Sequence, residues 1–212
     1  MFVIYLICGG YLPCINKQNN TMKQKNGIIC LETEWEHTIE RNRRSIHTKP
    51  LLEFLEKSSE CEIIYRRVAT KNELKYYLRR FNLTRYDNYS IIYLSFHGDT
   101  HSIFLEGEKG DEAVLSLSDL AHLSDGVFKD RFVHFSSCRT LLGSEKELEK
   151  FKTEIGAKCI SGYTKSVDGI LSAINDIAYF DRIFNYATMK GLESAMDKLY
   201  SGLNDELGFK IY

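Results

Sequence analysis

The chain has 212 residues and a formal net charge of -1, with 28 Lys and Arg residues against 29 Asp and Glu residues. This length is sufficient for one domain with a sizeable core, and the balanced charge argues against a nucleic acid partner because no basic face stands out. The 6 cysteines form no Cys-x-x-Cys pair and several lie in apolar runs, which predicts a cytoplasmic protein with reduced thiols and no metal site.

Residues 1–25 are predicted to form an N-terminal extension of the folded domain, which we place at 26–212. The extension begins with the apolar stretch MFVIYLICGGYLPCI, but no Lys or Arg precedes this stretch as in a signal peptide. It is also shorter than the roughly 20 residues that cross a bilayer. We therefore expect no membrane span. The alternatives for this stretch are an export signal, an interfacial tether, an added N-terminal strand, or translation that starts at Met22.

Short apolar runs then alternate with segments of helical period, which is the pattern of βαβ units. The runs are rich in β-branched residues and have the length of strands buried on both faces. They comprise residues 28–31, 63–65, 91–94, 132–135 and 159–162. The sequence therefore predicts an α/β domain with a mainly parallel central sheet flanked by helices.

Helix starts are marked between these runs. Thr70 with Glu73 and Ser144 with Glu147 both form a capping box before an apolar stripe of helical spacing. Pro50 is suited to the first turn of another helix. We therefore expect crossover helices after the second, fourth and first strands, respectively.

The remaining segments predict a small hairpin, a short helix and a helical C-terminal quarter. The hairpin pairs 103–105 with 113–115, and the short helix follows Ser116. The C-terminal quarter is expected to break near Gly191. Its core-facing stripes are expected to contain Ile174, Ile177, Phe180, Phe184, Leu192, Ala195, Met196, Leu199 and Leu203.

Two of the predicted strands lead into reactive side chains at the carboxyl edge of the sheet, where open α/β sheets bind ligands. The run 91–96 leads directly into His97, and the run 132–135 ends shortly before Cys138. A thiol is nucleophilic as the thiolate, so a histidine that accepts its proton makes this pair a candidate for nucleophilic catalysis. The backbone N–H groups of Gly98 and Cys138 could then bind the oxyanion of a tetrahedral intermediate.

These motifs resemble those of the caspase-like cysteine peptidases and, among them, the CHAT family. The resemblance rests on HG at 97–98, SSC at 136–138, CRT at 138–140 and ISGY at 160–163, and it extends over residues 27–205. It implies a caspase-like three-layer sandwich and a cytoplasmic endopeptidase with a Cys-His dyad. It implies no cofactor, a protein or peptide substrate, and a regulatory or defence role.

The resemblance also implies that the loop after 159–163 lines the pocket for the substrate residue before the scissile bond. Ser161, Tyr163 and Asp168 are the substrate-binding candidates. Asp168 there could select a basic residue, since carboxylates pair well with Arg; alternatively, it caps or turns the loop before Gly169. Because relatives carry repeats or partner domains that this sequence lacks, an activating or targeting partner protein is expected.

Two hypotheses of other classes stay open. The first is a catalytically silent caspase-like module that binds a protein or peptide in the same cleft. The second is a flavodoxin-like nucleotide or cofactor binder, since a fold does not fix a function. Neither GxGxxG nor GxxxxGK[ST] occurs in the chain, so no phosphate-binding loop supports the second hypothesis.

Other polar residues near these motifs have structural interpretations. Asp99 either orients His97 or closes a turn. His101 has the spacing of a metal partner for His97, but the segment between them lacks the helix that such a pair requires. His134 and Cys159 lie within predicted strands and are expected to pack in the core.

Overall fold

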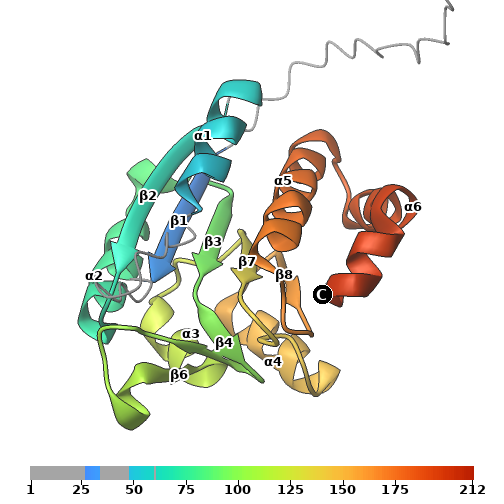
Figure 1. The fold of residues 1–212 in the computed structure, drawn as a ribbon. Helices are drawn as coiled ribbons and strands as arrows, with labels where there is room; N and C mark the ends of the chain where they lie inside the picture. The colour runs from blue at the N-terminus through green and yellow to red at the C-terminus, as the bar shows by residue number, and fades with distance from the viewer. Residues whose placement is uncertain (1–26, 34–47, 60) are drawn as a thin grey trace, which may run out of the picture.

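A six-stranded sheet forms the centre of the computed structural model, which describes residues 27–33, 48–59 and 61–212 (Figure 1). The strand order is β2-β1-β3-β7-β8-β9, and all neighbours are parallel except β8 and β9. The strands are β1 (Gly27–Thr33), β2 (Glu62–Val68), β3 (Ile91–Ser95), β7 (Phe132–Ser136), β8 (Cys159–Tyr163) and β9 (Phe209–Ile211). All five apolar runs therefore form strands as predicted, whereas β9 was not predicted. The extension 1–25 lies outside the described residues.

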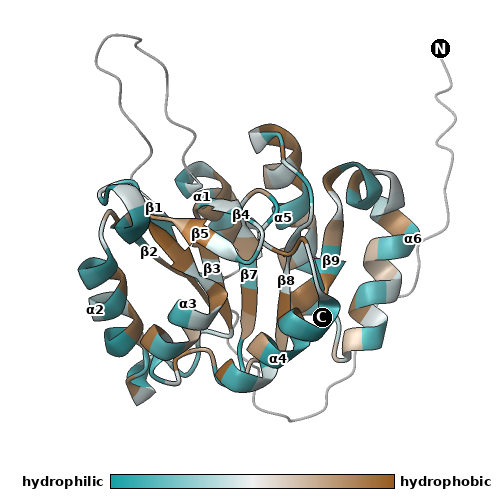
Figure 2. Cartoon of the chain, turned by 90° about the horizontal axis from the view of Figure 1, so that it is seen from below, coloured by the Kyte–Doolittle hydropathy of each residue, from teal (hydrophilic) through white to brown (hydrophobic). Residues whose placement is uncertain are grey.

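Helices cover both faces of the sheet. One face packs against α1 (Lys49–Ser58), α5 (Gly169–Asn185) and α6 (Met189–Leu207), and the other against α2 (Lys71–Phe81), α3 (Leu117–Ser124) and α4 (Glu145–Ile155). In Figure 2 the strands are largely apolar and lie between helices whose outer faces are polar. Among the described helices, none has the length and apolarity needed to cross a membrane. The predicted α/β architecture, a mainly parallel sheet flanked by helices, is confirmed.

The two capping boxes differ in outcome. Thr70 accepts a hydrogen bond from the Glu73 N–H, and Glu73 bonds back to the Thr70 N–H, so the first box forms in full. Ser144 precedes α4 but makes no side-chain capping bond. The Glu147 carboxylate instead lies 3.0 Å from His101 Nδ1. A tertiary contact with His101 therefore replaces the second half of the predicted box.

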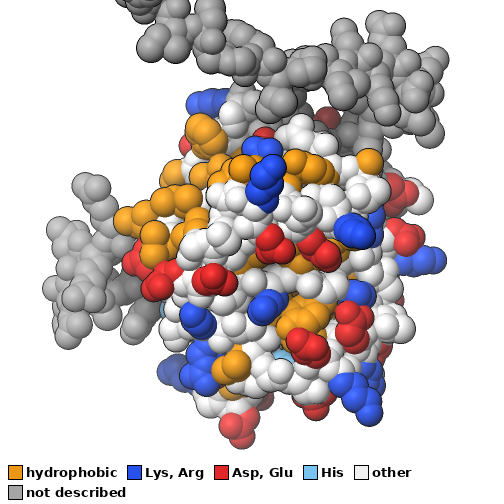
Figure 3. Space-filling view, turned by 90° about the vertical axis from the view of Figure 1, so that its right-hand side faces the viewer, with side chains coloured by type: hydrophobic (Ala, Val, Ile, Leu, Met, Phe, Trp, Pro, Cys, Tyr) orange, Lys and Arg blue, Asp and Glu red, His pale blue; other side chains and the backbone are white. Residues whose placement is uncertain are grey.

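The C-terminal helices form, but their break and part of their buried face differ from the prediction. The break lies at 186–188, and Gly191 is inside α6. Ile174 is 50% exposed and Leu199 is 54% exposed, whereas Asp176 is fully buried against the sheet. On the side where α6 faces outward, acidic and basic side chains are interspersed (Figure 3). The stripe prediction is confirmed at Phe180, Leu192, Ala195 and Met196, which are buried, and is wrong at Ile174 and Leu199.

The edge strand β2 also departs from its predicted burial. Its segment 63–65 was expected to be buried on both faces, but only Val68 of β2 is buried. β2 is the last strand on its side of the sheet, so one flank has no neighbouring strand among the described residues. An apolar run does not distinguish an edge strand from a central one.

A second, three-stranded antiparallel sheet lies in the connection from β3 to α3. It consists of β4 (His97–Asp99), β5 (Ser102–Phe104) and β6 (Val114–Ser116) in that order. Pairing of β5 with β6 confirms the predicted hairpin, and α3 follows β6 as expected. Two short 3-10 helices cover Thr84–Tyr86 and Gly110–Ala113.

The direction of strand succession reverses between β1 and β3. From β1 the chain passes through α1 to β2 on one side, and then crosses back through α2 to β3 on the other side. At such a reversal the connections leave the carboxyl ends of the two neighbouring strands in opposite directions, which opens a crevice where ligands bind in α/β folds. His97 lies directly beyond β3 at this position.

Candidate active site

His97 and Cys138 follow the carboxyl ends of two adjacent parallel strands. His97 opens β4 immediately after the end of β3, and Cys138 lies just beyond the end of β7. We call residues 97–101 the histidine loop and residues 137–140 the cysteine loop. The structure thus places both candidate residues at one edge of the sheet, as the sequence predicted.

The histidine loop and the cysteine loop are bonded to each other. Asp99 Oδ1 lies 3.3 Å from Arg139 Nε. The His101 N–H donates to the Thr140 carbonyl at 3.2 Å. The Thr140 hydroxyl donates to the Ser102 carbonyl at 3.2 Å. Side-chain and backbone bonds together fix the position of one loop relative to the other.

Gly98 is the point of closest approach between the two loops. A Cβ placed on Gly98 would lie 2.3 Å from Thr140 Oγ1 and 2.9 Å from the Cys138 carbonyl oxygen. Real Cβ atoms do not approach other atoms so closely. Glycine is therefore required at this position, because the space beside its Cα is filled by the cysteine loop.

We expect Gly98→Ala to separate the two loops. Overpacking of this kind lowers the free energy of unfolding by about 1–3 kcal/mol, and urea denaturation measures the change. Gly202→Ala is the matched control, since nothing lies within 4 Å of a Cβ at that helical position; it should be neutral or stabilising by up to about 1 kcal/mol. Equal stability of Gly98→Ala and the unchanged protein would contradict the tight packing.

Cys138 is half-buried and its sulfur is held by the loop after β8. The Val167 N–H donates to Cys138 Sγ at 3.4 Å, and the Arg139 N–H donates to the Lys165 carbonyl at 3.0 Å. Arg139 has a φ of 58°, a left-handed conformation that turns the chain sharply after the cysteine. Within the described ranges no acceptor is bonded to the Cys138 N–H, which is compatible with the predicted oxyanion role.

His97 has a carboxylate partner that the sequence analysis did not identify. Its Nε2 lies 3.3 Å from Glu106 Oε1, and the two side chains are 51% and 28% exposed. Asp99, the predicted alternative, pairs with Arg139 and accepts a hydrogen bond from the Thr100 N–H at 2.7 Å. The turn interpretation of Asp99 therefore holds. Glu106 lies in a loop without periodic pattern, so no sequence signal points to it.

The match to known families spans this whole arrangement. A model described as a family of unknown function, DUF6642, matches residues 25–212. The chain belongs to this family. None of the curated proteins that were compared matches this chain. His97, Cys138 and Glu106 all lie inside the matched region of this DUF6642 domain.

Two of the substrate-binding candidates in this DUF6642 domain face its interior. Ser161 and Tyr163 are both fully buried. Ser161 Oγ lies 2.9 Å from His134 Nδ1, and the Tyr163 hydroxyl donates to Asp176 Oδ1 at 2.5 Å. Their side chains are therefore internal hydrogen-bonding groups, which corrects the prediction that they contact a substrate.

Asp168 caps α5. Its Oδ1 accepts hydrogen bonds from the Ile170 N–H at 2.9 Å and the Leu171 N–H at 3.0 Å. This is the capping alternative that the sequence left open, and it satisfies two of the unpaired donors of the first helical turn. A role in selecting a basic substrate residue would have to be compatible with this capping.

The His101 side chain contacts helix α4. Its Nδ1 is paired with Glu147 of α4. Across residues 27–33, 48–59 and 61–212 there is no group of three or more His, Cys, Asp or Glu side chains arranged to hold a metal ion.

The other described cysteines contrast with Cys138. Cys30, Cys61 and Cys159 are buried, whereas Cys138 is partly exposed. Burial raises the pKa of Cys61 to about 12 and that of Cys159 to about 11. These thiols stay protonated and shielded at neutral pH, and Cys159 is a core residue as predicted. Cys138 is thus the described thiol that a reagent or a substrate reaches.

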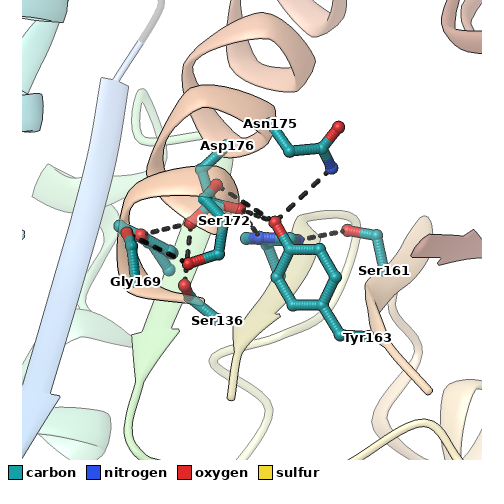
Figure 4. A network of polar contacts seen from close by, with 9 residues as sticks. Ser136, Ser161, Tyr163, Gly169, Ser172, Asn175 and Asp176 are labelled. Atoms are coloured by element: carbon teal, nitrogen blue, oxygen red, sulfur yellow. Dashed lines mark hydrogen bonds and ion pairs between the residues drawn. The ribbon is translucent and has the colours of Figure 1, made fainter. Parts of the chain in front are cut away.

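A buried polar network centred on Asp176 supports the strand that leads to Cys138 (Figure 4). Asp176 Oδ2 accepts hydrogen bonds from the Tyr93 hydroxyl at 2.6 Å and the Ser136 hydroxyl at 2.8 Å. Its Oδ1 lies 2.7 Å from His134 Nε2 and accepts from Tyr163. The network joins β3, β7 and β8 to α5. It also explains His134, which packs at the sheet-helix interface as expected.

Proposed function

We propose that this DUF6642 domain is a cysteine endopeptidase with a caspase-like fold, in which Cys138 is the nucleophile and His97 transfers protons. The observation that carries the proposal is the packing of the histidine loop against the cysteine loop at Gly98, where a Cβ would lie 2.9 Å from the Cys138 carbonyl oxygen. Helices on both faces of a mainly parallel sheet support the caspase-like assignment. The proposed substrate is a protein or peptide.

The chemistry follows from the residue types. His97 takes the proton of the Cys138 thiol, the resulting thiolate attacks the scissile carbonyl carbon, and the electrons of the carbonyl double bond move to its oxygen. The N–H groups of Cys138 and Gly98 stabilise that oxyanion. His97 gives a proton to the leaving amine, which leaves a thioester on Cys138. A water molecule, deprotonated by His97, then hydrolyses the thioester and restores the thiol.

Half-exposure of Cys138 supports this role more than a structural one. A buried thiol packs as a small apolar group, as Cys30 and Cys159 do in the core. Cys138 instead lies at the carboxyl edge of the sheet, beside the crevice expected between β1 and β3. Its sulfur accepts a hydrogen bond from the Val167 N–H at 3.4 Å.

The test is cleavage of a diverse peptide library by the full chain under reducing conditions, before and after treatment with iodoacetamide. We expect cleavage to be lost in proportion to alkylation of Cys138, as measured by peptide mapping. Cys61 and Cys159 should stay unmodified in the native protein at pH 8, because burial raises their pKa to about 12 and about 11, and they should react after denaturation.

Two results would contradict the proposal. Cleavage that persists when Cys138 is fully alkylated would exclude it as the nucleophile. Absence of any cleavage, with a library peptide still bound in the crevice, would favour the catalytically silent binding module.

A further inference from the structure

We propose that Glu106 is a positioning residue for His97, which rests on the peptidase function proposed above. The carboxylate Oε1 lies 3.3 Å from His97 Nε2. The resemblance to caspase-like peptidases implies a dyad without an obligatory third member, so this role is particular to the geometry of this chain.

The backbone around Glu106 is fixed to the ends of two strands. The Glu106 N–H donates to the Thr33 hydroxyl at 3.3 Å, at the carboxyl end of β1. The next N–H, of Gly107, donates to the Ala69 carbonyl at 2.9 Å, just beyond β2. A Cβ on Gly107 would lie 2.7 Å from that same oxygen. The loop that carries Glu106 is therefore seated closely on the sheet, and the carboxylate is delivered to a defined place.

The contact determines which imidazole nitrogen serves the reaction. A carboxylate beside Nε2 favours the tautomer that carries its proton on Nε2, as a carboxylate does in other His-dependent sites. Nδ1 is then the nitrogen that exchanges a proton with Cys138 and the leaving amine. The negative charge of Glu106 also stabilises the imidazolium that forms after proton transfer, so its effect should fall on the chemical step.

Neighbouring carboxylates are committed to other groups. Asp99 pairs with Arg139 and closes its own turn. Glu108, on the same loop as Glu106, accepts a hydrogen bond from the Lys71 N–H at 3.1 Å. Glu108 therefore offers a matched control, since it has the same chemistry and lies in the same loop but bonds the start of α2.

The experiment measures kcat and KM for the full chain and its Glu106→Gln, Glu106→Asp and Glu108→Gln variants on a peptide that the unchanged protein cleaves. We expect Glu106→Gln to lower kcat about tenfold with little change in KM, because a partly exposed charge contributes modestly to the barrier. Glu108→Gln should match the unchanged protein. Thermal unfolding of each variant shows whether the fold is retained.

The kcat of Glu106→Asp relative to that of Glu106→Gln separates a charge effect from a packing effect. Gln keeps the shape of Glu but not its charge, and Asp keeps the charge but not the shape. A positioning role through charge predicts that Glu106→Asp retains more of kcat than Glu106→Gln, and the reverse order would overturn it. An unchanged kcat in Glu106→Gln would overturn the positioning role alone. No cleavage by the unchanged protein would overturn the peptidase function and this role together.

Discussion

Cys138→Ala is expected to lower kcat/KM for peptide cleavage by roughly a thousandfold or more, and His97→Ala by a similar factor. The alanine at 138 has no nucleophile to form the thioester, and the alanine at 97 leaves neither a base for the thiol nor an acid for the leaving amine. The measurement is kcat/KM on a peptide selected from the library.

The double variant gives the sharper result. A nucleophile and its proton carrier act as one unit, so we expect Cys138→Ala with His97→Ala to be no less active than either single variant. His122→Ala is the control, because His122 is an exposed histidine on α3 and should leave kcat/KM unchanged. Effects of the two single variants that multiply in the double variant would show that Cys138 and His97 act separately.

The placement of His97 and Cys138 at one edge of the sheet could be predicted because two separate patterns converge. Each residue follows an apolar run, and runs of that kind form parallel strands whose carboxyl ends share one edge of the sheet. The structure places both residues at that edge, with the two loops in contact at Gly98. The contact between the two loops depends in addition on strand order, because β3 and β7 are neighbours in the sheet.

Glu106 and Asp176 could not be found in the same way. Glu106 reaches His97 from a loop seated on β1 and β2, and no spacing in the sequence reports that docking. Asp176 lies among apolar positions of α5. A periodic pattern of apolar residues does not report which polar partners a residue of the helix meets inside the fold. Ser161 and Tyr163 were misassigned for the same reason: the strand that carries them was predicted, but the direction of their side chains toward Asp176 depends on tertiary contacts.

Asp176→Asn is expected to lower the free energy of unfolding by about 3–5 kcal/mol at neutral pH, the range for breaking a buried ion pair. The substitution removes the charge opposite His134 and places amide hydrogens where the carboxylate accepts from Tyr93 and Ser136. Urea denaturation measures the change. Asp181→Asn is the matched control on the same helix, because Asp181 pairs with Arg182 at the surface, and it should cost less than about 1 kcal/mol.

The pH dependence of the stability difference between the unchanged protein and Asp176→Asn tests the charge of Asp176 directly. Burial alone would raise the pKa of Asp176, but the attraction and hydrogen bond of His134, with the hydrogen bonds of Tyr163 and Tyr93, outweigh burial and hold the pKa below its ordinary value. A carboxyl with a lowered pKa contributes stability that is present above its unfolded pKa, about 3.9, and is lost as the pH falls through its folded pKa. The stability gap between the unchanged protein and Asp176→Asn should therefore be constant at neutral pH and narrow below about pH 4. A gap that widens on acidification would mean that Asp176 is buried as the neutral acid.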